Sequence, residues 1–125
     1  ADPTIDAIWC LRGGYGATRL LPQIDVDAVR ARPKALIGYS DITALHAVWR
    51  RAGLVSFHGP TARGQFTPFT LDSFRRAIVS GEDSAGPCPT ATVLRDGITP
   101  GQLAGGNLAL IASLCGTPWA FDFAG

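Results

Sequence analysis

The 125-residue chain has little of several residue types on which particular protein classes depend. It contains no methionine, and charged residues make up only 17% of it, with 11 basic and 10 acidic side chains and a net charge of +1. That balance argues against a surface that coats nucleic acid. No apolar run approaches the length of a membrane span, and no charged-then-apolar leader opens the chain. We therefore expect a soluble protein with neither nucleic acid nor a membrane as partner.

Metal-ligating and disulfide-forming patterns are also missing. The three cysteines, Cys10, Cys88 and Cys115, lie far apart and in no C-x-x-C arrangement, which predicts free thiols in a reducing, cytoplasmic compartment. The two histidines, His46 and His58, show no ligand spacing with the scattered acids. The sequence thus predicts no metal and no cofactor.

What the chain does contain is the alternation of a parallel α/β fold. Its 46% hydrophobic content and its length suit a folded domain with a real core. Apolar runs predict strands over 5–11, 35–39 and 54–57, and helical spacing predicts helices over 17–21, 25–32 and 42–52. Strands that alternate with helices are typical of a parallel sheet with crossover helices, here a three-layer α/β domain.

The character of the sequence changes after Pro60. A helix is expected over 71–79, a Ser-, Gly- and Pro-rich linker over 80–90 and a strand over 91–94. We expect residues 1–65 to form the first domain, 66–90 a helix and linker, and 91–125 the beginning of a smaller second α/β domain. The absence of Met and the aromatic last residues suggest an internal fragment.

Ser40 is the strongest candidate for chemistry. The apolar run 35–39 breaks at Gly38, delivers Ser40 and passes at once into a helical segment. A strand-to-helix turn exposes the serine Oγ and points the following backbone N–H groups toward a developing oxyanion. The match to the hydrolase pattern G-x-S-x-G is incomplete, because Ile42 stands in place of the second glycine. From these residues alone, a simple helix N-cap is the more common role for such a serine.

A glycine-rich turn follows the first strand, at the sheet edge where Ser40 is expected. Gly13, Gly14, Tyr15 and Gly16 form neither a dinucleotide loop, since Arg19 replaces the third glycine, nor a phosphate loop. The turn could supply a second oxyanion donor, or it could simply require positive φ angles.

Partners for a nucleophilic serine are few. His46 lies six residues after Ser40, a spacing that points it away and favours a packing role. His58 follows the third strand at the same edge and could act as a base or line a pocket. Asp41 belongs to the helix start, where the dipole favours a carboxylate. No acid is visibly placed to orient a histidine.

Taken together, five motifs resemble the LD-carboxypeptidase family, whose members are serine peptidases that include muramoyltetrapeptide carboxypeptidases and microcin-C self-immunity hydrolases. In order, these motifs are Arg12-Gly13-Gly14-Tyr15-Gly16, Ile37 to His46, His58-Gly59-Pro60, Gly105-Gly106-Asn107-Leu108 and Gly116-Thr117-Pro118. Each is weak alone, but their order over nearly the whole chain is specific.

The resemblance implies that Ser40 is the nucleophile, that the backbone N–H groups of Gly14 and Asp41 form the oxyanion hole, and that no cofactor is needed. Gly13, Tyr15 and His58 become candidate substrate-binding residues. The implied reaction cleaves the amide before a terminal D-amino acid in cytoplasmic peptidoglycan tetrapeptides, and full-length members commonly form homodimers. The family's catalytic Glu and His would lie beyond Gly125, and its first strands before the glycine turn. We therefore expect this chain alone to be inactive.

Three alternatives stay open at this point. The chain could belong to a non-catalytic peptide- or muropeptide-binding relative, or to a hydrolase of peptide-nucleotide antibiotics of the microcin-C type. It could also be a self-sufficient hydrolase with His58 as the base, which requires His58 to lie within hydrogen-bond reach of Ser40.

Overall fold

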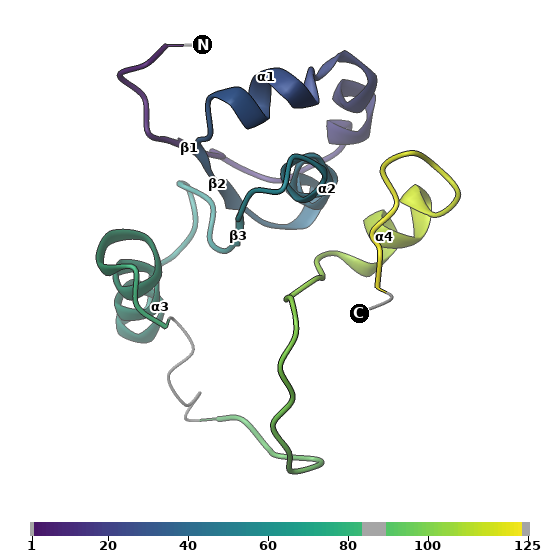
Figure 1. The fold of residues 1–125 in the computed structure, drawn as a ribbon. Helices are drawn as coiled ribbons and strands as arrows, with labels where there is room; N and C mark the ends of the chain where they lie inside the picture. Colours follow the sequence, from purple (N-terminus) through teal and green to yellow (C-terminus); the bar gives the residue numbers. More distant parts are fainter. Residues whose placement is uncertain (1, 84–89, 124–125) are drawn as a thin grey trace. The chain divides into compact units, whose positions relative to one another are not determined.

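The computed structural model describes residues 2–83 and 90–123, which fall into two compact units (Figure 1). The first combines 1–64 with 103–125, and the second is formed by 65–102. This grouping differs from the sequence-based division, in which 91–125 begin another domain.

The first unit is built on a three-stranded parallel sheet, in the order β1 (Ala7–Trp9), β2 (Ala35–Gly38), β3 (Phe57–His58). Ile8 pairs with Leu36, and Gly38 pairs with His58. The predicted parallel α/β class is confirmed, although the third strand begins later than the apolar run suggested. Because all three strands run the same way, the segments that follow them leave from one edge of the sheet.

Helices cover this sheet and join its strands. They are the 3₁₀-helix η1 (Ala17–Gln23), α1 (Val26–Ala31), the short 3₁₀ turn η2 (Ser40–Ile42), α2 (Thr43–Arg51) and α4 (Leu108–Leu114). The first was expected to stop before Pro22 but includes it, and the Ile24 N–H donates to the Leu21 carbonyl to close the last turn. The fixed φ of proline suits a 3₁₀-helix, so the expected end was wrong.

The hydrophobic core of this unit lies around α2. Ala44 and Val48 of α2 and Leu36 of β2 are fully buried, and Leu114 of α4 joins the same cluster. Trp49 is also buried, and its indole Nε1 donates to the Lys34 carbonyl at 2.7 Å. This core holds the start of α2, and with it Ser40, against the end of β2.

The first strand is not the buried strand that its apolar residues predicted. All three residues of β1 are exposed, including Ile8 at 42% of its surface. A continuous apolar run predicts burial on both faces of a sheet, but in the described residues β1 is an edge strand paired only with β2.

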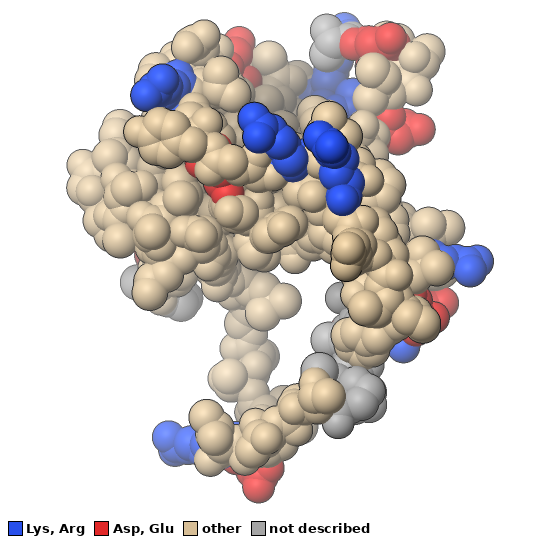
Figure 2. Space-filling view, turned by 180° about the vertical axis from the view of Figure 1, so that it is seen from behind, with Lys and Arg blue, Asp and Glu red and all other residues tan. Residues whose placement is uncertain are grey.

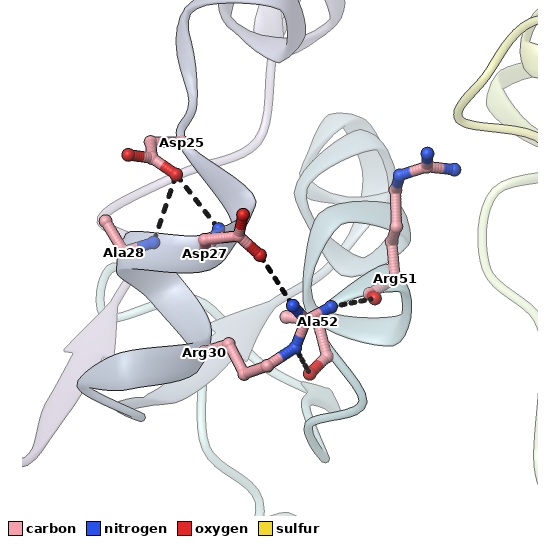
Figure 3. A network of polar contacts seen from close by, with 6 residues as sticks. All are labelled: Asp25, Asp27, Ala28, Arg30, Arg51 and Ala52. Atoms are coloured by element: carbon pink, nitrogen blue, oxygen red, sulfur yellow. Dashed lines mark hydrogen bonds and ion pairs between the residues drawn. The ribbon is translucent and has the colours of Figure 1, made fainter.

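A polar network fastens α1 to the end of α2 (Figure 3). The Asp25 carboxylate accepts the N–H groups of Asp27 and Ala28 and so caps α1. Arg30 then donates to the Asp27 carboxylate at 2.6 Å and to the Ala52 carbonyl at 3.2 Å. The expected helix over 25–32 is confirmed, with its start set by the Asp25 side chain.

The Gly-Gly-Asn segment attaches α4 to the start of α2. Asn107 caps α4 by accepting the Leu110 N–H, while its own backbone N–H donates to the Thr43 Oγ1 at 2.9 Å. A Cβ on Gly106 would lie 2.5 Å from the Thr43 Cγ2. Only glycine allows this approach, so α4 shares the core of the first unit.

The second unit contains α3 (Pro68–Phe74), capped by the Thr67 side chain and continued by a π-helical turn η3 (Arg75–Ser80). The expected helix over 71–79 is confirmed. The expected strand over 91–94 is wrong, because these residues have no strand pairing and Leu94 is 94% exposed. Part of the expected linker, residues 84–89, lies outside the described residues.

Charges are sparse on the face shown in Figure 2, where blue and red side chains are scattered and form no large patch of one sign. Within the described ranges, no helix is long and apolar enough to cross a membrane.

Candidate active site

Ser40 occupies a strained turn at the carboxyl end of β2. Its φ angle is +63°, the only positive φ among the described residues other than glycine. A left-handed conformation costs a residue with a Cβ about 1–2 kcal/mol. The half-buried Ser40 then leads directly into η2 and α2. This strand–turn–helix path is the geometry that presents a nucleophilic serine in α/β hydrolases.

The helix-cap interpretation of Ser40 is wrong. The N-cap residue of α2 is Ile42, and that of η2 is Tyr39, with no side-chain capping bond at either. The Ser40 hydroxyl is therefore not used to start the helix that follows it.

Gly38 explains how this turn works without the second glycine of G-x-S-x-G. A Cβ on Gly38 would lie 3.0 Å from both the Cγ1 and the Cγ2 of Ile42, and 3.1 Å from the Cβ of Cys10. The buried Ile42 side chain thus packs closely against the glycine and helps to fix the turn. Burial also raises the pKa of the Cys10 thiol, which opposes reactivity there.

The glycine turn lies directly against the serine. A Cβ on Gly13 would be 3.0 Å from the Ser40 Cβ and 3.4 Å from its Oγ. Gly14 and Gly16 have φ angles of +135° and +108°. The expected left-handed backbone of this turn is therefore confirmed, and the turn lies beside Ser40. Its role as a second oxyanion donor stays a prediction.

Asp41 joins the two halves of the site. Its Oδ2 accepts the backbone N–H of Ala17 at 3.0 Å, and the residue is only 7% exposed. The carboxylate thus caps η1, where the glycine turn ends, rather than α2, to which the sequence assigned it. One residue after the serine, Asp41 fixes the distance between the serine turn and the glycine turn.

His46 has a structural role, as its spacing predicted. It is 4% exposed, with its Nε2 2.9 Å from the Gly38 carbonyl and its Nδ1 2.9 Å from the Ser56 Oγ. The carbonyl must accept, so Nε2 carries the proton and Nδ1 accepts from the Ser56 hydroxyl. Burial lowers the pKa of His46, assisted by the nearby His58 and opposed by the bond to Gly38. The ring therefore stays neutral, and its hydrogen bond to the Gly38 carbonyl helps to hold the turn before Ser40.

His58 lies at the same edge but is not bonded to the serine. Its ring is exposed, with its centre 5.6 Å from that of His46 and 6.4 Å from that of Tyr39. Partial desolvation lowers the pKa of His58. Within 2–83 and 90–123, no hydrogen bond joins His58 to Ser40.

The chain after His58 turns back across the end of β1, which sequence reasoning missed. The Gly59 N–H donates to the Gly38 carbonyl, and the Ala62 N–H to the Cys10 carbonyl. The Trp9 indole donates to the Pro60 carbonyl at 2.8 Å. The only sequence signal for this turn was the rigid Gly59-Pro60 pair, which did not indicate the direction of the chain after it.

The remaining candidate, Tyr15, projects from the glycine turn with 88% of its surface exposed, and the Arg19 guanidinium lies 5.3 Å from its ring centre. Cys10 and Cys115 are free thiols, while Cys88 lies outside the described residues. No group of three or more His, Cys, Asp or Glu side chains in the described ranges is placed to hold a metal ion.

The class of fold is defined by the parallel α/β sheet, with Ser40 in a strand–turn–helix and the glycine turn beside it. The family is identified by comparison with known proteins. Residues 1–59 match the LD-carboxypeptidase N-terminal domain, so this part of the chain belongs to the LD-carboxypeptidase family. The resemblance seen in the motifs is thereby confirmed.

Similarity extends beyond the matched domain. The murein tetrapeptide carboxypeptidase of Pseudomonas aeruginosa is 38% identical over 128 residues, covering 92% of this chain and 41% of the relative. The crystal structure of muramoyltetrapeptide carboxypeptidase from Oxalobacter formigenes superimposes with a TM-score of 0.79 at 32% identity, covering 96% of this chain and 42% of that one. A structure of the microcin C7 self-immunity protein gives a TM-score of 0.75 at 28% identity, covering 97% and 46%. The chain spans about two fifths of the length of the curated relatives it matches.

Proposed function

We propose that this chain carries the nucleophile of a serine LD-carboxypeptidase. The observation that supports this most directly is the conformation of Ser40, which holds a φ of +63° while Gly13 approaches its Oγ. Backbone strain at a residue that uses its hydroxyl for no capping bond is typical of a nucleophile.

In the proposed reaction, the Ser40 Oγ attacks the carbonyl carbon of the amide before a terminal D-amino acid and loses its proton to a base. The backbone N–H groups of Asp41 and Gly14 stabilise the resulting oxyanion. Among the described residues, the Gly14 N–H has no hydrogen-bond acceptor. The C–N bond then breaks, the amine takes up the proton and leaves as the free D-amino acid, and water hydrolyses the acyl-enzyme.

We place the base and its orienting acid outside this chain, as a His and a Glu of the complete protein. Both ring nitrogens of His46 are occupied, and His58 has no bond to Ser40 in the described part. The relatives are more than twice as long as this chain, which leaves room for these residues. We therefore expect the isolated chain to release no D-alanine. A cytoplasmic location and a homodimer of the complete protein stay predictions.

The substrate is proposed to be a peptidoglycan tetrapeptide ending in D-alanine. The names of the relatives from Pseudomonas aeruginosa and Oxalobacter formigenes support this choice. A microcin-type substrate is the second candidate, since the microcin C7 self-immunity protein shares the fold and 39% identity over 84 residues.

The test is D-alanine release by the complete protein that carries this chain. We expect release from a tetrapeptide ending in D-alanine, none from the same peptide ending in L-alanine, and loss of activity by at least about a thousandfold in Ser40→Ala. Turnover of an aminoacyl sulfamoyl adenosine but not of the tetrapeptide would favour the microcin-type alternative. Binding of both without turnover would indicate a non-catalytic relative.

A further inference from the structure

We propose that Arg12 binds the terminal carboxylate of the substrate and thereby makes the enzyme a carboxypeptidase. The proposal rests on the proposed function and adds the residue that recognises the free end of the peptide. Arg12 is the first residue of the Arg-Gly-Gly-Tyr-Gly motif, but the sequence alone assigns it no role.

The position of Arg12 places a cation at the oxyanion side of the site. Its guanidinium carbon lies 4.0 Å from where a Cβ on Gly14 would be, so the side chain folds back over the glycine turn. A Cβ on Gly13, the residue between Arg12 and Gly14, would lie 3.4 Å from the Ser40 Oγ. The exposed guanidinium and the proposed oxyanion donor thus lie on the glycine turn, directly beside the turn that carries Ser40.

The charge of Arg12 is not neutralised within the described residues. The ion pairs of Arg30 with Asp27 and of Arg76 with Glu82 do not involve it. The acid closest along the chain to the nucleophile, Asp41, is buried and accepts the Ala17 N–H instead. An exposed arginine with no acidic partner beside a reactive serine is suited to an anionic ligand.

The geometry of the substrate fits this placement. In a peptide cleaved before its last residue, only the amide nitrogen and one α-carbon separate the scissile carbonyl from the terminal carboxylate. That separation is on the order of 4 Å, about one residue along a chain. A substrate whose carbonyl oxygen is held by the Gly14 N–H therefore brings its carboxylate within reach of the guanidinium that lies over Gly14.

Arg19 provides an internal comparison. It belongs to the same region, but its guanidinium stacks over the Tyr15 ring at 5.3 Å. If the terminal carboxylate were bound only by the net positive charge at this edge of the sheet, Arg12 and Arg19 would contribute equally to its binding.

The experiment measures binding by the complete protein in a Ser40→Ala background, so that no turnover occurs. The probes are a tetrapeptide ending in D-alanine and the same peptide with a C-terminal carboxamide. We expect the free acid to bind roughly tenfold more tightly than the amide, as a charge-assisted pair at an exposed site would give. Arg12→Gln should abolish that preference, Arg12→Lys should keep part of it, and Arg19→Gln should leave most of it.

An unchanged acid-over-amide preference in Arg12→Gln, or equal losses in Arg12→Gln and Arg19→Gln, would overturn the proposal. Turnover is measured separately on the protein with Ser40 intact. Absence of D-alanine release there would refute the proposed reaction, whereas the binding preference tests Arg12 itself.

Discussion

At the scale of single residues, the site is held by side chains that do no chemistry. The Asp41 side chain, next to Ser40, accepts the first N–H of η1, and the buried His46 side chain donates to the Gly38 carbonyl. Both are buried polar groups whose bonds are satisfied, so removing either leaves an unpaired partner in a dry environment. The strain at Ser40 persists because these contacts fix the backbone on both sides of it.

The strain itself is measurable. Ser40→Gly and Ser40→Ala both remove the hydroxyl and should both abolish activity, but only glycine adopts a φ of +63° without cost. We expect the glycine variant to unfold with a free energy about 1 kcal/mol higher than the alanine variant, by chemical denaturation of the complete protein. The opposite order of stability would show that position 40 is not held in the left-handed region.

His46 should make stability depend on pH. Burial lowers its pKa below the ordinary value of 6.5, so the unfolded state binds more protons as the pH falls below that value. The stabilisation is complete above pH 6.5 and is lost as the pH falls toward the folded-state pKa. We expect the melting temperature of the complete protein to fall between about pH 7.5 and pH 5.5.

The matched variant is His46→Gln, which cannot titrate. This variant should be less stable than the parent protein at neutral pH, and its stability should depend less on pH. Part of the pH dependence that remains should come from His58, whose pKa is also lowered. An equal slope in the variant and the parent protein would mean that His46 does not carry the effect.

The sequence allowed prediction of the serine turn because its signal is local. Gly38 and Ser40, followed by helical spacing, lie within a few residues of one another. The bond from Asp41 to Ala17 spans 24 positions and has no sequence signature. The sequence also left the choice between helix cap and nucleophile open. The missing capping bond excludes the helix cap, while the role of nucleophile stays a proposal.

At the scale of helices and strands, prediction succeeded where a pattern and a cap agreed. The core spacing of α2 and the Asp25 cap of α1 both specify helices independently of the rest of the fold. It failed at β1, whose apolar residues lie on an exposed edge strand, and at 91–94, where strand-forming residues find no neighbour to pair with. Strand formation depends on partners, which a local pattern does not contain.

The attachment of α4 to α2 gives a prediction at this scale. Gly106→Ala would place a Cβ 2.7 Å from the Thr43 Oγ1 and add a side chain at a φ of +149°. We expect it to destabilise the protein by about 1–3 kcal/mol, measured by chemical denaturation. Gly105→Ala is the control, because a Cβ there would meet open space. Similar losses in both variants would argue against close packing of Gly106 on Thr43.

At the scale of the whole molecule, the chain places the proposed nucleophile, two proposed oxyanion donors and a cation at one edge of a parallel sheet. Arg12 and Gly14 follow β1, and Ser40 and Asp41 follow β2. Open α/β sheets assemble a site in this way from residues far apart in sequence. We propose that the nucleophile belongs to this chain and that the base and acid belong to the rest of the protein. That division explains why the described residues hold a strained serine without a hydrogen-bonded histidine.

The proposed role of Ser40 can be tested by covalent labelling of the complete protein with a fluorophosphonate, a reagent that modifies activated serines. Peptide mass spectrometry should find one adduct, on Ser40, and D-alanine release should disappear as that adduct forms. The Ser40→Ala variant should remain unlabelled. Labelling of a different serine, together with D-alanine release that survives in Ser40→Ala, would contradict the account.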